Sequence, residues 1–117
     1  NSDRKDDAEK AMSKLRIKLA RKDYESGRMY LKLEEYESAI IYFQSVLNQY
    51  YDTEVSDDAR IGIIFSHILD NNRNGASNYF LSQEEHFLSK DKYREAENLL
   101  ENTKTNMKLY HYYHLYK

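Results

Sequence analysis

Histidine is the residue type to consider first for metal chemistry, because the chain contains no cysteine. His111 and His114 are three positions apart, so a helix would place both imidazoles on one face, as metal ligands require. No acidic residue lies between them, and Glu101 is distant in the sequence. We therefore predict no metal site and no cofactor, and we expect the aromatic tail that carries both histidines to dock on the last helix pair.

The other polar residues form no catalytic pattern. His67 and His86 fall in helical segments without a serine, cysteine or paired acid at the spacing of a nucleophilic triad. The adjacent acids that could suggest acid–base catalysis are Glu34–Glu35, Asp57–Asp58 and Glu84–Glu85. Neighbouring helical side chains point about 100° apart, so solvated helix ends explain these pairs better than carboxylate dyads do. We predict that the chain is not an enzyme.

The composition favours long helices and excludes several classes of protein. The 117 residues include no proline and three glycines, and 32% of them are charged. A formal charge of −2 gives no basic field for nucleic acid, and no apolar run approaches the roughly 20 residues that span a bilayer. Because the first residue is Asn, we expect a processed product or a fragment, which a signal peptide or a lipidated N-terminus could precede.

The spacing of small and aromatic residues predicts the helices that position the polar side chains considered above. Read as a unit of about 34 residues beginning at Ala20, the chain has the spacing of a tetratricopeptide repeat. The positions of the pattern are occupied by Gly27, Tyr30, Tyr36, Ala39, Phe43 and Tyr51. Gly27 and Ala39 would let two antiparallel helices approach closely, while the aromatic residues fill the seam between them. Such a unit must stack on neighbours to bury its apolar face, which indicates a binding scaffold.

Two further segments repeat parts of this pattern. The second carries Gly62, Phe65, Ala76 and Phe80, and the third carries Tyr93, Ala96 and Leu100. We therefore predict one all-α domain over residues 1–117, built of tetratricopeptide-like stacked antiparallel hairpins, an α-solenoid of about five helices. Residues 20–53 form the clearest repeat, residues 54–88 a degenerate one, and residues 90–117 a C-terminal helix with the aromatic tail.

Apolar periodicity and breaker residues place the helix boundaries. We expect frayed residues at 1–7, one long helix over about 6–33, and a second helix from Tyr36. Asp52-Thr53 should cap a third helix that runs from Val55 to Leu69. The polar run at 70–75 predicts a loop, with a fourth helix from about residue 76, and a corner at 89–91 leads into the fifth.

A basic stretch on the long helix is the candidate partner-binding surface. It consists of Arg16, Lys18, Arg21, Lys22 and Arg28. Its functional interpretation is contact with an acidic partner through Arg21, Lys22 and Arg28, together with Tyr24, and the alternative is a solvated helix face. The chain contains twelve tyrosines. Tyrosine is a frequent interface anchor, and an AT-rich genome is the alternative explanation for its high number.

The stretch from Leu19 to Ala59 resembles the BamD family of bacterial outer-membrane assembly lipoproteins. The shared features are a basic helix followed by three motifs, which here read Gly27-Arg28-Met29-Tyr30, Tyr36-Glu37-Ser38-Ala39-Ile40 and Tyr50-Tyr51-Asp52-Thr53. The sequence departs from the family at Tyr51, where proline is usual, and at Met29, where phenylalanine is common.

The resemblance implies a non-catalytic, protein-binding scaffold at the periplasmic face of the bacterial outer membrane. Its partners would be the barrel-assembly subunit BamA and unfolded outer-membrane proteins, and this chain would be the C-terminal portion of such a protein. The alternative is a generic tetratricopeptide adaptor, in the cytoplasm or the periplasm, that binds a peptide or partner protein in its concave groove.

Overall fold

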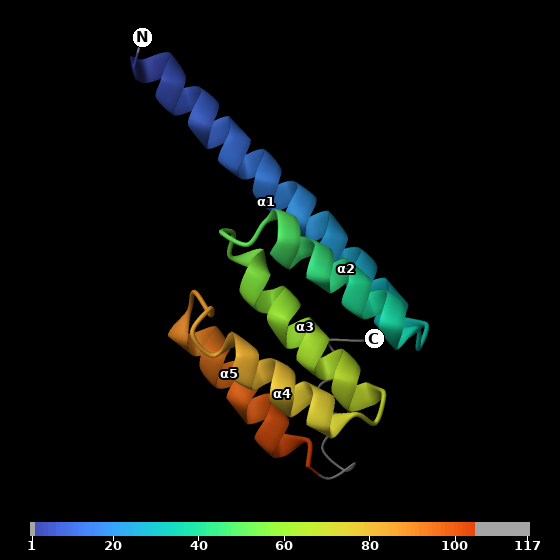
Figure 1. The fold of residues 1–117 in the computed structure, drawn as a ribbon. Helices are drawn as coiled ribbons and strands as arrows, with labels where there is room; N and C mark the ends of the chain where they lie inside the picture. The colour runs from blue at the N-terminus through green and yellow to red at the C-terminus, as the bar shows by residue number, and fades with distance from the viewer. Residues whose placement is uncertain (1, 105–117) are drawn as a thin grey trace.

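The computed structural model describes residues 2–104 and consists there of five α-helices (Figure 1). They are α1 (Ser2–Lys32), α2 (Tyr36–Gln49), α3 (Val55–Leu69), α4 (Arg73–Gln83) and α5 (Lys90–Asn102). The prediction of an all-α, tetratricopeptide-like fold is confirmed. The expected aromatic tail, with His111 and His114, lies outside the described residues.

Helix α3 is the centre of the arrangement. It packs against α1, α2, α4 and α5, and twelve of its residues are buried (Figure 1). Helices α1 and α2 form the first antiparallel hairpin, α3 and α4 form the second, and α5 follows against α3. Because α3 is buried on nearly every side, it needs neighbours all round, and the other helices supply them.

The Phe43 ring of α2 is held between two glycines on different helices. A Cβ added to Gly27 of α1 would lie 2.5 Å from this ring, and one added to Gly62 of α3 would lie 2.8 Å from it. Both distances are shorter than van der Waals contact, so any side chain at either position would displace the ring. Phe43, fully buried, thereby joins the first hairpin to the second.

The residues expected to pack between repeats lie in or against this core. The buried ones are Gly27, Ala39, Phe43, Gly62, Phe65, Ala76, Phe80 and Ala96. The half-buried ones, packed against the core cluster, are Tyr30, Tyr36, Tyr93 and Leu100. Tyr30 stacks on Tyr42 of α2, with ring centroids 5.2 Å apart.

Two helices begin earlier than the sequence predicted. Helix α1 starts at Ser2, so the expectation of frayed residues at 1–7 is wrong for residues 2–7, the part that the structure describes. The first turns of α1 place opposite charges four apart, as at Lys5 and Glu9, which favours a helix. Helix α4 starts at Arg73 instead of residue 76, because Asn72 is its N-cap and accepts a hydrogen bond of 3.0 Å from the Gly75 amide. The loop before α4 is therefore shorter than the predicted run at 70–75.

The capping predicted for α3 is also wrong. Helix α3 follows Glu54, which makes no side-chain cap hydrogen bond. The Thr53 hydroxyl donates instead to the Tyr50 carbonyl at 2.8 Å, and Asp52 pairs with Arg16 of α1. Both side chains are thus used to fix the turn between α2 and α3.

Candidate partner-binding face

Asp58 links the three helices α1, α3 and α5 through its carboxylate. One oxygen lies 3.2 Å from a guanidinium nitrogen of Arg21 on α1, and the other lies 3.0 Å from the ammonium of Lys92 on α5. Lys92 also pairs with Glu95 at 3.4 Å. We call the surface made by Arg21, Tyr24, Arg28, Asp58 and Lys92 the inner face.

Tyr24 provides the aromatic part of the inner face. Its ring centroid lies 5.5 Å from that of Phe43, and the Arg21 guanidinium lies 5.4 Å from the centre of the Tyr24 ring. Burial, with the negative charge of Asp58 as the next contribution, raises the pKa of the Tyr24 hydroxyl to about 12. The hydroxyl therefore stays protonated, and can donate a hydrogen bond, across the physiological range.

The charged groups of the inner face reinforce one another. Burial alone would lower the pKa of the Lys92 ammonium, but its hydrogen bond to Asp58 and the charges of Asp58 and Glu95 outweigh burial and raise that pKa. Lys92 consequently remains a cation beside Asp58. Arg28 pairs with Glu25 at 3.0 Å one turn along α1.

The structure separates the four residues expected to bind a partner into two sets. At about 100° per residue, Arg21, Tyr24 and Arg28 share one side of α1, toward α3. The Asp58 contact of Arg21 fixes the direction of that side. Lys22 lies about 100° further round the helix and is exposed, so it belongs to a different surface.

Asp58 and Lys92 were not identified from the sequence as part of this face, although a signal exists. A repeat of about 34 residues that starts at Tyr24 reaches Asp58 and then Lys92. Equivalent positions of stacked repeats lie side by side, so this period would have placed all three residues in one row.

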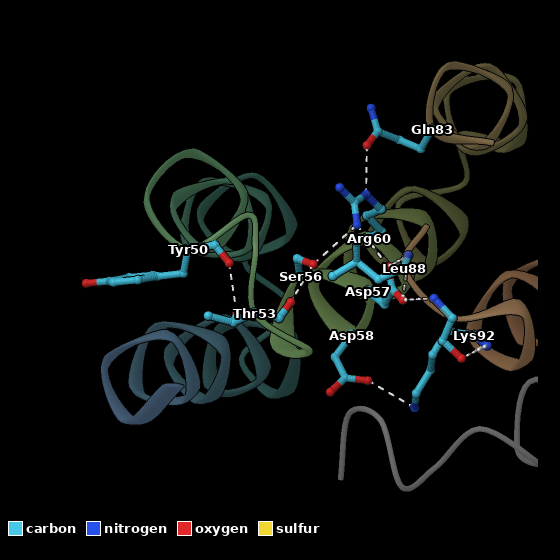
Figure 2. A network of polar contacts seen from close by, with 10 residues as sticks. Tyr50, Thr53, Ser56, Asp57, Asp58, Arg60, Gln83, Leu88 and Lys92 are labelled. Carbon is cyan, nitrogen blue, oxygen red and sulfur yellow. Dashed lines mark hydrogen bonds and ion pairs between the residues drawn. The ribbon is translucent and has the colours of Figure 1, made fainter. Parts of the chain in front are cut away.

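Next to the inner face, Asp57 and Arg60 form a buried ion pair of 2.9 Å (Figure 2). The Asp57 carboxylate also accepts hydrogen bonds from the backbone amides of Leu88 and Ser89, at 3.0 Å and 2.9 Å. Arg60 donates to Gln83 of α4 at 2.9 Å. The expectation that the Asp57–Asp58 pair is a solvated helix end is therefore wrong, because Asp57 holds the corner between α4 and α5.

The ionisation of Tyr24 tests the geometry of the inner face. We expect the absorbance difference near 295 nm between the parent chain and Tyr24→Phe to titrate at about pH 12, about two units above free tyrosine. Because the folded-state pKa exceeds the unfolded one, the contribution of Tyr24 to stability is intact below about pH 10 and is lost as the pH rises through 12. A midpoint at pH 10 in the folded chain would contradict the half-buried placement of the Tyr24 ring against the core.

In the described part of the chain, no cluster of three His, Cys, Asp or Glu side chains is placed to bind a metal ion. Within residues 2–104, no helix combines the length and apolar character needed to cross a bilayer.

Comparison with known proteins found one relationship. A family model described as YfiO, outer membrane lipoprotein, matches residues 1–67, which extend from α1 into the last turn of α3. Searches of curated proteins and of solved structures gave no match.

Proposed function

The chain belongs to the YfiO family of outer membrane lipoproteins, and from this premise we propose that it is a non-catalytic, protein-binding subunit of the outer-membrane β-barrel assembly machinery. The family match covers the first hairpin and most of α3, and these elements carry the Arg21–Asp58 part of the inner face. The proposed location is the periplasmic face of the outer membrane, as in the BamD-like proteins that the sequence resembles.

The partner we propose is the set of periplasmic domains of the barrel-forming subunit BamA, with unfolded outer-membrane proteins as transient clients. The observation that carries this proposal is the row of Tyr24, Asp58 and Lys92, which lie on α1, α3 and α5. Arg21 of α1 lies beside this row. Stacked helical hairpins use such extended surfaces for protein binding. An aromatic anchor framed by arginines is the composition that protein interfaces favour.

Charge reversal on the inner face tests the proposal. We expect the Arg21→Glu/Arg28→Glu chain to associate with the BamA periplasmic domains about tenfold more slowly than the parent, with a smaller change in dissociation rate. The defect should shrink as added salt shortens the Debye length below about 8 Å. The measurement is surface-binding kinetics at several salt concentrations.

A matched control reverses two charges elsewhere. Lys90 and Arg94 are exposed on α5 and lie about 160° round the helix from Lys92. Lys90→Glu/Arg94→Glu makes the same change in net charge and should leave the association rate near that of the parent. Equal slowing by both double variants would mean that net charge, and not the inner face, governs association.

A pull-down separates this function from the alternative. The whole chain, used as bait in an outer-membrane extract and a cytosolic extract of the source bacterium, should recover the barrel-assembly subunit. Recovery of cytosolic proteins alone would reject the assembly role and favour the generic tetratricopeptide adaptor. That adaptor would bind a peptide in a groove formed by α1, α3 and α5.

A further inference from the structure

Helices α4 and α5 lie side by side and enclose a groove of about 500 Å³ (Figure 1). Residues of both helices line it, among them Ser77 and Phe80 of α4 and Glu97, Leu100 and Glu101 of α5. Phe80, which is 7% exposed, and the half-buried Leu100 give the groove an apolar floor. The other three residues are exposed and form a polar rim. An apolar floor with a few polar groups is the usual composition of a binding groove.

One end of the groove is fixed by Arg73, the first residue of α4. Its guanidinium donates hydrogen bonds to the backbone carbonyls of Leu100 and Thr103, where α5 ends. The last carbonyls of a helix lack partners within the helix, so these bonds hold the end of α5 against the start of α4. Lys104, the last residue that the structure describes, also lines the groove. Residues 105–117, which we call the C-terminal segment, therefore begin at its edge.

The repeat period predicts a helix for this segment. Equivalent positions of the three units are Tyr24, Asp58 and Lys92. Helix α2 begins at Tyr36, twelve residues after Tyr24, and α4 begins at Arg73, fifteen residues after Asp58. The same offsets after Lys92 give a start at about residues 104–107. Among residues 2–104, α5 has no second helix of its own unit, and the groove is open at the place where that helix would pack.

The sequence of the C-terminal segment suits the groove. Its apolar and aromatic residues are spaced as one face of a helix, at positions i, i+3, i+4 and i+7: Leu109, Tyr112, Tyr113 and Tyr116. The wall on the α5 side also extends over seven residue steps, from Glu97 to Lys104. At about 1.5 Å per residue, the face and the wall have the same length of about 10 Å.

The charges of the segment and of the groove are complementary. The segment contains Lys108 and Lys117 and no acidic residue. Of the two cations beside the groove, Arg73 is held by the α5 carbonyls, and Lys104 pairs with Glu101 at 3.0 Å. Glu97 is exposed on the rim and has no ion pair with another described residue. A cationic segment meets attraction there, which favours correct docking.

We propose that the C-terminal segment binds in the groove between α4 and α5 and is the second helix of the third hairpin. Its aromatic face contacts the floor at Phe80 and Leu100, and His111 and His114 lie on the opposite side, in water. The groove is thus the site for the docking that the sequence predicts for the aromatic tail. Glu97 lies about 140° round α5 from Lys92, so this site is separate from the inner face.

The reactivity of a cysteine in the groove wall tests the proposal in the whole chain. Because the chain has no cysteine, Ser77→Cys and Ser82→Cys each supply a single thiol. Both serines are exposed, and Ser82 lies about 140° round α4 from Ser77. We expect iodoacetamide to modify Ser77→Cys at least about tenfold more slowly than Ser82→Cys, because the bound segment covers only the first thiol. Each rate is divided by the rate of the same variant in urea, and equal ratios would overturn the proposal.

Substitutions in the segment test which of its sides is bound. Tyr112→Ser, added to Ser77→Cys, should raise the modification rate about fivefold or more, because an aromatic contact with the floor is lost. Tyr110→Ser should change that rate by less than about twofold, because Tyr110 lies about 160° round the helix from Tyr112. Equal effects of the two substitutions, or no effect of either, would contradict the proposed aromatic contact.

Charge reversal on the rim tests the electrostatic part. Glu97→Lys/Glu101→Lys should raise the modification rate of Ser77→Cys by about three- to tenfold, because the rim then repels Lys108 and Lys117. The control, Glu84→Lys/Glu85→Lys, makes the same change in net charge at two exposed residues that do not line the groove. It should leave the rate within about twofold of the starting value. Equal increases for both double variants would contradict a specific contact at the rim.

The dependence on protein concentration distinguishes the segment from a second molecule. Binding within one chain gives the same protection of Ser77→Cys from about 1 μM to about 100 μM, because the local concentration of the segment is set by the chain itself. Protection that appears only as the concentration rises would assign the groove to a second copy and reject the segment as its occupant. Either result leaves the proposed assembly function untouched, since the inner face is a different surface.

Discussion

Replacing Phe43 with alanine is expected to lower the free energy of unfolding by about 3–5 kcal/mol, the usual cost of emptying a buried aromatic site. The Phe43 side chain is fully buried. It occupies the space left by Gly27 and Gly62, and neither glycine has a side chain that could fill the cavity. A loss of this size is a large part of the roughly 5–15 kcal/mol that stabilises a domain. Urea unfolding followed by circular dichroism measures it.

An exposed aromatic residue is the control for the loss of stability that we expect from removing the buried Phe43 ring. Tyr51 has 65% of its surface exposed, so Tyr51→Ala should change the free energy of unfolding by less than about 1 kcal/mol. Similar unfolding midpoints for Phe43→Ala and the parent would refute the assignment of Phe43 to the seam between the hairpins.

A second substitution tests the partnership between Phe43 and Gly27. Gly27→Ala alone should destabilise the chain by about 1–3 kcal/mol, because the new methyl group meets the Phe43 ring. In the Phe43→Ala background the same change should cost much less, since the ring is gone. Additive effects would mean that the two residues do not share one space.

The first hairpin could be predicted from the sequence because its signals are local and periodic. Gly27 and Phe43 belong to one repeat pattern, and their packing follows from the way two neighbouring helices bury an apolar face. Gly62 and Phe65 repeat part of that pattern, so the second hairpin was also predictable. The start of α4 was not, because Asn72 caps the helix through a hydrogen bond that a polar loop sequence does not reveal.

The buried role of Asp57 was not predictable from its own neighbourhood. An acid in the first turn of a helix ordinarily interacts with solvent and with the helix dipole. Here its partners include the backbone amides of Leu88 and Ser89, which are about thirty residues away and reach Asp57 only after α4 has folded back onto α3. Only the three-dimensional path of the chain brings these groups together.

Replacing Asp57 with alanine is therefore expected to cost about 3–5 kcal/mol, the penalty for breaking a buried ion pair by removing one partner. Arg60, 6% exposed, would keep a buried charge without its carboxylate. The amides of Leu88 and Ser89 would lose their acceptor as well. Hydrogen exchange should show faster exchange at these two amides and in α5 than in α2.

The neighbouring residue is a matched control for this substitution. Asp58→Ala also removes one carboxylate from the first turn of α3, but its ion pairs with Arg21 and Lys92 are partly exposed. Partly exposed pairs contribute little, so we expect a loss of at most about 1 kcal/mol. Equal losses for the two variants would contradict the distinction between a buried joint at Asp57 and an accessible binding surface at Asp58.

A double variant separates the ion pair from the amide contacts of Asp57. Asp57→Leu/Arg60→Met removes both charges, so the cost of an unpaired buried arginine disappears. The Leu88 and Ser89 amides still lack an acceptor, so stability should return only in part, to about 1–3 kcal/mol below the parent. Full recovery would show that the ion pair alone determines the loss. If no stability is recovered, Asp57 stabilises the corner before α5 chiefly by accepting hydrogen bonds from the Leu88 and Ser89 amides.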